Sequence, residues 1–120
     1  MKYSDANRKD FYDRVYEVVE QIPKGKVTTY GAIASYLGVA SGARMVGYAL
    51  NNAAEAEIPA HRVLNRLGEL TGRGHFPGDT MRERLRQENV TFVAEYTVDI
   101  EQHFWNPEEM KTESNQTSHE

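Results

Sequence analysis

The sequence predicts a mainly α-helical fold of the winged-helix or helix-turn-helix type, with a short strand or wing and a disordered acidic tail. Three observations favour this fold. Apolar residues recur at helical spacing over residues 5–22. Two short amphipathic segments follow, separated by a turn that contains glycine. Few apolar residues remain after residue 105, so we expect one domain over residues 1–105 and a disordered tail over residues 106–120.

The first predicted helix covers residues 5–22. Five apolar side chains share one of its faces: Phe11, Val15, Val18, Val19 and Ile22. Ser4 or Asp5 can serve as its N-cap, and Pro23-Lys24-Gly25 is expected to end it. Residues 26–28 then form a short extended link.

A pair of short helices is predicted next. Thr29 is the expected N-cap of a helix over residues 30–37, and Gly38 suits the left-handed position that closes it. Ser41 is the expected N-cap of a helix over residues 42–51. The buried face of this second helix should hold three residues, Val46, Ala49 and Leu50.

The second half of the chain is predicted to be less regular. Residues 51–59 indicate a loop, and the glycine-rich residues 71–78 indicate another. Between them, residues 62–70 form either a strand pair that turns near Gly68 or an irregular wing. A strand is also expected within residues 92–100.

A fourth helix is predicted from Asp79, its N-cap, to about Glu88. Met81 and Leu85 should face inward, and Asn89 can close the helix. Arg84 and Glu88 have the spacing of an ion pair along one helix face.

The formal net charge of −4 is unevenly distributed along the chain. Residues 24–90 hold nine Lys and Arg against six Asp and Glu, and seven of the nine are arginines. Residues 91–120 hold one cation against seven anions. The middle of the chain therefore permits phosphate contacts, whereas the acidic end should repel nucleic acid.

Several chemistries are excluded or disfavoured by composition. The sequence has no cysteine, which excludes disulfides, thiolate metal sites and a cysteine nucleophile. No two of the four histidines have metal-site spacing, so we expect no metal and no cofactor. No apolar stretch approaches the roughly 18 residues of a membrane span, and the N-terminus does not resemble a signal peptide. These features fit a cytoplasmic protein without membrane partners.

Three segments carry a family resemblance: Gly25–Ala34, Ala43–Asn52 and Pro59–Val63. They read GKVTTYGAIA, ARMVGYALNN and PAHRV. In order and spacing they resemble the DNA-binding domain of the O6-alkylguanine-DNA alkyltransferases, over roughly residues 8–92. The active-site motif of that family is Pro-Cys-His-Arg-Val, and its cysteine accepts the alkyl group. This chain has Ala60 at the cysteine position, and alanine has no nucleophile.

The chain is therefore more similar to the alkyltransferase-like proteins, in which that cysteine is replaced. The resemblance implies a sensor without enzymatic activity that binds O6-alkylguanine in double-stranded DNA through the minor groove. It implies that the base is flipped into a pocket without cysteine and that the site is flagged for nucleotide excision repair. Bacterial excision-repair proteins are the implied partners, the bacterial cytoplasm or nucleoid is the implied location, and we expect a monomer.

Two residues are implied to extrude the base. Arg44 lies near the start of the second helix of the pair, where its guanidinium can fill the vacated stack. The matching family residue is the intercalating finger, and the alternative is an ordinary solvated arginine. Tyr30 can press on the phosphate of the flipped nucleotide, as its family counterpart does, and the alternative is a core aromatic.

Five residues match positions around the family's pocket. Ala60 frees volume where the thiol would lie, which favours larger alkyl groups. His61 has no thiol to ionise, so we expect a buried, hydrogen-bonded core histidine, with contact to the bound base as the alternative. Glu88 matches the acid of the histidine relay and is expected to be structural. Thr71 matches a residue that reads the alkylated oxygen, and Asn52 approximates the hinge asparagine.

Four cations are further candidates for DNA contact. Arg73 lies between two glycines on a loop, where it can stack on or hydrogen-bond the flipped guanine, or contact phosphate instead. Arg62, Arg66 and Lys26 are candidate phosphate contacts.

Two other functions are consistent with parts of the sequence. The first is a helix-turn-helix transcriptional regulator that reads undamaged DNA in the major groove. Small residues on the second helix of the pair (Ala43, Gly47 and Ala49) favour close approach to a minor groove instead. The second is a hydrolase that uses His61 with Glu88.

Overall fold

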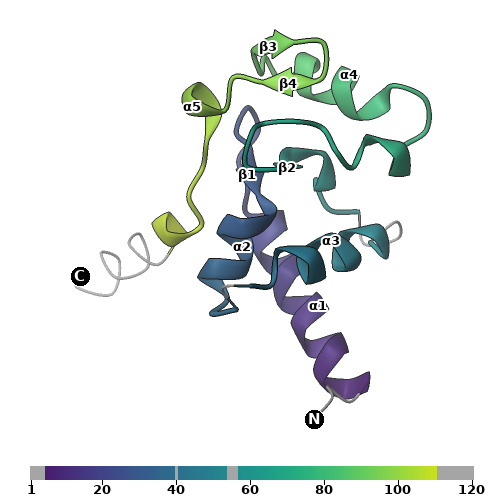
Figure 1. Ribbon diagram of the computed structural model, residues 1–120, viewed down its shortest axis with the longest axis vertical. Coiled ribbons are helices and arrows are strands. Elements are labelled where there is room, and N and C mark those ends of the chain that lie inside the picture. The colour runs from purple at the N-terminus through teal and green to yellow at the C-terminus, as the bar shows by residue number, and fades with distance from the viewer. Residues whose placement is uncertain (1–4, 40, 54–56, 111–120) are drawn as a thin grey trace.

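The structure, a computed structural model, describes residues 5–39, 41–53 and 57–110, with side chains from residue 8 onward. The helices are α1 Asp5–Glu20, α2 Tyr30–Tyr36, α3 Ala43–Asn51, α4 Thr80–Gln87 and α5 Ile100–His103. The strands are β1 Thr28–Thr29, β2 Val63–Leu64, β3 Phe92–Ala94 and β4 Thr97–Val98, and the 3-10 turns are η1 Ala60–Arg62 and η2 Arg73–His75. Figure 1 shows α1, α2 and α3 in the lower part of the molecule, with the short strands, turns, α4 and α5 above them.

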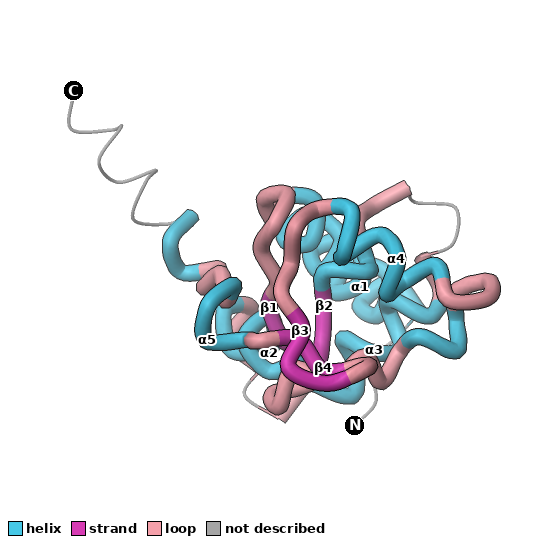
Figure 2. The backbone as a smooth tube through the Cα atoms, turned by 90° about the horizontal axis from the view of Figure 1, so that it is seen from above, coloured by secondary structure: helices cyan, strands magenta, loops and turns pink. Residues whose placement is uncertain are grey.

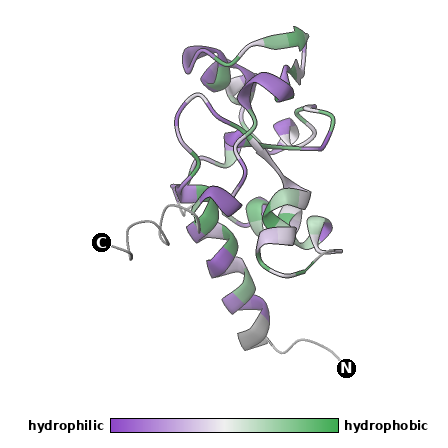
Figure 3. Cartoon of the chain, turned by 90° about the vertical axis from the view of Figure 1, so that its left-hand side faces the viewer, coloured by the Kyte–Doolittle hydropathy of each residue, from purple (hydrophilic) through white to green (hydrophobic). Residues whose placement is uncertain are grey.

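Helix α1 confirms the prediction for the N-terminal segment, although it ends two residues before the expected end at Ile22. Its apolar stripe is visible as alternating hydrophobic and hydrophilic bands in Figure 3. All five residues of the predicted face are buried, including Ile22, which follows the helix. The proposed cap Ser4 lies outside the described residues.

Helices α2 and α3 form the predicted helix-turn-helix pair. The Thr29 hydroxyl accepts a hydrogen bond from Ala32 N at 3.0 Å, which confirms the predicted cap. Gly38 has φ +84°, as expected for the residue that closes α2. The predicted cap at Ser41 is wrong, because Gly42 occupies that position and α3 starts without a side-chain cap. A Cβ on Gly42 would lie 2.7 Å from Val39, so this close turn requires glycine.

A small parallel sheet joins the two parts of the molecule. β1 pairs with β2 in parallel, with Thr28 opposite Val63 and Thr29 opposite Leu64. Val63 packs into the helical core, whereas Leu64 belongs to the upper core, because successive side chains of a strand point in opposite directions. The upper core consists of Val27, Leu64, Leu70, Met81, Leu85, Val90 and Val98.

Residues 62–70 form an irregular wing rather than a strand pair that turns near Gly68. The turn at Gly68 is present, with φ +84°, but its two arms pair with other segments. β2 pairs with β1, and Glu69 forms an isolated bridge with Thr97. β3 and β4 form an antiparallel hairpin where one strand was expected; the hairpin lies above the parallel pair in Figure 1, and the two overlap in the view from above in Figure 2.

Helix α4 has the predicted buried residues Met81 and Leu85, and Asn89 follows it with φ +68°. Asp79 is at the N-cap position, but its side chain makes no cap hydrogen bond. The predicted ion pair between Arg84 and Glu88 is wrong, because the Glu88 carboxylate is directed toward η1 instead.

The segment after α5 packs on the domain as far as Met110. Trp105 is buried, and its backbone N–H donates to Val27 O at 2.7 Å. Pro107 is buried and Met110 packs against the helical core. Residues 106–110 therefore belong to the packed chain, whereas the rest of the predicted tail, residues 111–120, lies outside the described residues. Within residues 5–39, 41–53 and 57–110, no helix has the length and apolar character that crossing a bilayer requires.

Candidate nucleic-acid interface

The outward face of α3 lines a surface hollow. Small and exposed residues spaced along this face contribute to it: Ala43, Arg44, Gly47, Tyr48 and Asn51. Tyr30, Gly72 and His75 complete the hollow, whose volume is about 370 Å³. A Cβ on Gly47 would meet nothing within 4 Å, so this part of the helix is open to an approaching molecule. Arg44 is exposed at its edge.

A second pocket, of about 360 Å³, adjoins this hollow. The two share Tyr30, Asn51, Gly72 and His75. The other residues around the second pocket are Leu50, Ala53, Glu57, Ile58, Ala60, Phe76, Pro77, Met81 and Arg84. A mostly apolar pocket of this size with a few polar groups is typical of sites for small molecules or single bases. Ala60 contributes a methyl group and no reactive atom.

Tyr30 lies where the two hollows meet. Its hydroxyl hydrogen-bonds with the Thr71 side chain, and burial raises its pKa above the ordinary value, opposed by that hydrogen bond. A Cβ on Gly72 would lie 3.0 Å from the Tyr30 hydroxyl oxygen, so glycine lets this loop approach closely. Tyr30 and Ala60 thus line the same pocket, and Thr71 contacts Tyr30 without lining either hollow.

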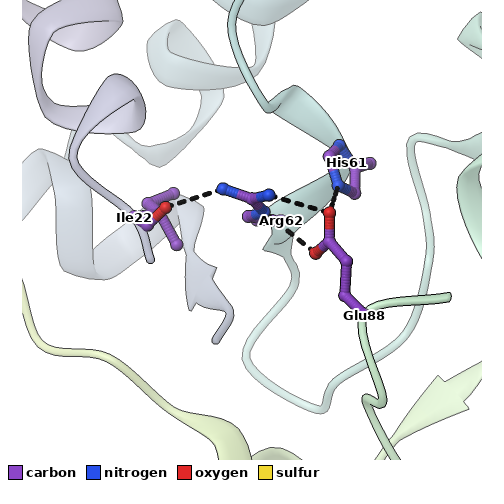
Figure 4. Close-up of polar contacts among 4 residues, drawn as sticks. All are labelled: Ile22, His61, Arg62 and Glu88. Atoms are coloured by element: carbon purple, nitrogen blue, oxygen red, sulfur yellow. Dashed lines mark hydrogen bonds and ion pairs between the residues drawn. The ribbon is translucent and has the colours of Figure 1, made fainter. Parts of the chain in front are cut away.

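A buried polar cluster, drawn in Figure 4, follows the pocket residue Ala60 along the chain. His61 Nε2 is 2.9 Å from Glu88 Oε2. Arg62 donates to both carboxylate oxygens of Glu88, at 3.0 and 2.8 Å, and to Ile22 O at 2.8 Å. Only 6%, 15% and 10% of the side chains of His61, Arg62 and Glu88 are exposed. We call these three residues, with the Ile22 carbonyl, the η1 cluster.

The η1 cluster has an unusual protonation pattern. Burial lowers the pKa of His61 below its ordinary value and outweighs the opposing effect of Glu88, so the imidazole is neutral near pH 7. Burial alone would raise the pKa of Glu88, but the hydrogen bonds from Arg62 and His61 lower it below the usual value. Neutral His61 then donates from Nε2 to Glu88, and its buried Nδ1 has no partner among the described residues.

Three predicted DNA contacts require correction or refinement. Arg62 is not available to phosphate, because three hydrogen bonds hold its guanidinium in the η1 cluster. Asn52 does not line the pocket: its amide donates to Tyr48 O at 2.9 Å. Arg73 is exposed, but its guanidinium carbon lies 3.9 Å from the centre of the Tyr96 ring rather than in the pocket.

The remaining predictions hold in part. His61 is the buried, hydrogen-bonded histidine that we expected, and Glu88 is its structural partner. Because His61 does not line the pocket, it is not placed as the base of a hydrolase. Lys26 and Arg66 are exposed outside both hollows.

The sequence interpretation missed most of the pocket lining, including Asn51, His75, Phe76 and Arg84. Asn51 lies four residues after Gly47 and therefore on the same outward face of α3. This spacing could have distinguished Asn51 from Asn52. His75 and Phe76 lie in the glycine-rich loop and Arg84 lies on α4, and the packing of α4 against η1 and η2 brings these segments together. No cluster of metal-ligating side chains occurs in the described part of the chain.

A helix-turn-helix pair with an open second helix and an adjoining pocket defines a DNA-binding domain that can accommodate one extruded base. Comparison with known proteins supports this class. The family described as 6-O-methylguanine DNA methyltransferase, DNA binding domain, matches residues 10–90. The chain belongs to this family.

The chain is also similar over most of its length to named relatives. It is 39% identical over 104 residues to Alkyltransferase-like protein 1 of Schizosaccharomyces pombe, covering 82% of this chain and 96% of that protein. It is 35% identical over 98 residues to the DNA base-flipping protein of Vibrio parahaemolyticus, covering 81% and 97%. The crystal structure of S. pombe Atl1 in complex with damaged DNA containing O6-carboxymethylguanine aligns with TM-score 0.74 and 35% identity, covering 89% and 100%. These relatives place the chain among the alkyltransferase-like proteins.

Proposed function

We propose that this protein recognises O6-alkylguanine in double-stranded DNA without removing the alkyl group. One observation carries the proposal: the pocket beside the open face of α3 has Ala60 at the position where the methyltransferases carry their acceptor cysteine. The chain contains no cysteine at all, so an alkyl group has no thiol to which it could transfer. The similarity to relatives named for base flipping and for damaged DNA supports the same function rather than that of a transcriptional regulator.

Recognition would begin when α3 enters the minor groove. Its small residues Ala43 and Gly47 allow the backbone to approach the groove floor closely. Arg44 would then fill the space left by the extruded guanine and hydrogen-bond the partner base, while Tyr30 directs the adjacent phosphate outward. Both residues line the hollow along α3, and Tyr30 also lines the adjoining pocket.

The extruded base would occupy the second pocket. Ala60 leaves space for the alkyl group, Asn51 supplies a polar group of the pocket lining, and Thr71 holds the hydroxyl of Tyr30. Selectivity follows because an alkylated guanine pairs weakly and costs less to unstack than a normal guanine.

A sensor without chemistry requires a later repair step. We propose that the complex is handed to nucleotide excision repair, since the chain has no means of its own to restore the base. We also propose that the chain acts as a monomer, because one helix-turn-helix pair and one pocket suffice for one lesion.

The test is a binding titration with a duplex that carries one O6-methylguanine, beside the same duplex without the modification. The wild-type protein should prefer the modified duplex. Arg44→Ala should weaken binding to it about tenfold or more, which corresponds to ~1.4 kcal/mol or more. Arg14→Ala, an exposed arginine on α1 outside both hollows, is the matched control and should bind as the wild type does. Equal affinity of the wild type for the two duplexes would overturn the proposed function.

A further inference from the structure

Arg84 is a pocket residue that the proposed mechanism does not use. It lines the pocket together with Ala60, and it is exposed. Its expected partner Glu88 is occupied by His61 and Arg62. Among the described residues no hydrogen bond or ion pair engages the Arg84 guanidinium, so this cation is available to a ligand.

Arg84 lies on the side of α4 that faces η1 and the pocket. Met81, one turn before it, also lines the pocket, and Glu88, one turn after it, contacts His61 of η1. The three residues therefore follow one side of α4, which packs against η1. Burial, and to a smaller extent the charges of Arg62 and Arg84, hold the pKa of His61 down, and α4 itself packs against η1, the turn that carries Ala60.

Building on the proposed function, we propose that Arg84 is a specificity-determining residue that favours guanine adducts ending in a negative charge, such as O6-carboxymethyl, over neutral adducts of equal size. An alkyl group that extends from the extruded base toward Ala60 would bring a terminal carboxylate to the Arg84 guanidinium. Arginine binds carboxylates through two parallel hydrogen bonds, which gives geometric selectivity as well as attraction.

General electrostatics oppose this preference, so a local cation is needed to produce it. The protein has a net charge of −4 and DNA is a polyanion, so an additional negative charge on the adduct is disfavoured at long range. Glu57 also lines the pocket and is exposed. Its carboxylate opposes an anionic adduct, and Glu57→Gln should therefore strengthen binding of that adduct.

The experiment compares four matched duplexes in one buffer. They carry O6-carboxymethylguanine, its neutral amide analogue O6-carbamoylmethylguanine, O6-methylguanine, or unmodified guanine. The wild-type protein should bind the carboxymethyl duplex about tenfold more tightly than the carbamoylmethyl duplex, the scale of a hydrogen-bonded charge pair. Arg84→Gln should bring the two to near equality and keep the preference for O6-methylguanine over guanine. Arg86→Gln removes the same charge from the same helix away from the pocket and should behave as the wild type.

Two results would overturn the inference while leaving the proposed function intact. One is equal wild-type affinity for the carboxymethyl and carbamoylmethyl duplexes. The other is an Arg84→Gln variant that weakens all four duplexes by the same factor, which would make Arg84 a phosphate contact. If the wild type did not distinguish O6-methylguanine from guanine, the proposed function would fail, and this inference with it. Thermal unfolding of each variant checks that the fold is unchanged.

Discussion

The η1 turn has two sides that differ in almost every physical property. On one side, His61 and Arg62 are buried and bonded to Glu88 and Ile22, far apart in the sequence. On the other side, Ala60 faces an open pocket and offers only a methyl group. The comparison teaches that a buried polar network can support a turn beside a pocket although the turn carries no nucleophile. Binding selectivity must then come from the shape and charge of the pocket.

Removing the charge of Glu88 should have the largest effect on the stability of the η1 cluster. Glu88→Gln should destabilise the fold by about 3–5 kcal/mol, because Arg62 would remain buried without its anionic partner. Urea or guanidinium unfolding measures the change. Glu83→Gln, an exposed residue of the same helix, should change stability by less than ~0.5 kcal/mol. A small effect of Glu88→Gln would show that the η1 cluster is not a structural support.

Acid should weaken the same cluster without a mutation. The pKa of Glu88 lies below its unfolded value, so its contribution is present above that value and lost as the pH falls through the folded pKa. The pKa of His61 is also lowered, so the unfolded chain takes up protons first as the pH falls below about 6.5. Both groups therefore reduce stability on acidification. Thermal unfolding between pH 7 and 4 measures this, and a melting temperature that rises over that range would contradict the assignment.

Much of the fold follows from local sequence, but the η1 cluster does not. Helices α1, α2 and α4 were predictable because their apolar spacing and the Thr29 cap are local signals. Arg62 was predicted to contact phosphate because its partner Ile22 lies 40 positions away, beyond any local pattern. The pairing of β1 with β2 was missed for the same reason.

The binding surface was predictable to a different degree. Family resemblance identified Tyr30, Arg44 and Ala60, and the structure brings all three to the two adjoining hollows. Resemblance suggested Asn52 where the helix geometry selects Asn51, because neighbouring residues of a helix point about 100° apart. Arg84 and His75 depend on how α4 and the glycine-rich loop pack, which residue types alone do not reveal.

A larger side chain at Gly47 should block the hollow along α3 without disturbing the η1 cluster. Gly47→Leu should keep or raise stability by up to ~1 kcal/mol, because leucine favours helix more than glycine does. The same change should reduce affinity for an O6-methylguanine duplex about hundredfold, or ~3 kcal/mol, by holding α3 away from the groove. Gln21→Leu adds the same side chain outside both hollows and serves as the control. Unchanged binding by Gly47→Leu would place the DNA on another face.

A larger side chain at position 60 should alter the pocket and leave the η1 cluster unchanged. Ala60→Trp reduces the space beside the extruded base. We expect affinity for an O6-benzylguanine duplex to fall about tenfold relative to O6-methylguanine, with little change for unmodified DNA. Titrations with the three duplexes measure the difference. A uniform change across adduct sizes would contradict the assignment of Ala60 to the alkyl group.

The smallest expected effects distinguish the two neighbouring asparagines. Asn51→Ala should weaken binding of the modified duplex severalfold with little change in stability, since Asn51 lines both hollows. Asn52→Ala should instead lower stability by about 0.5–1 kcal/mol through loss of its bond to Tyr48 O, and leave binding unchanged. Weaker binding by Asn52→Ala together with unchanged binding by Asn51→Ala would show that Asn52 is the residue that contributes to binding.

Recovery of an isotopically labelled methyl group tests the central claim most directly. The protein is incubated with a duplex whose single O6-methylguanine carries the label, the complex is isolated, and protein and DNA are separated under denaturing conditions. The account predicts a one-to-one complex in which all of the label remains on guanine, since the chain has no acceptor thiol. Label covalently attached to the polypeptide, or free in solution as a hydrolysis product, would contradict it.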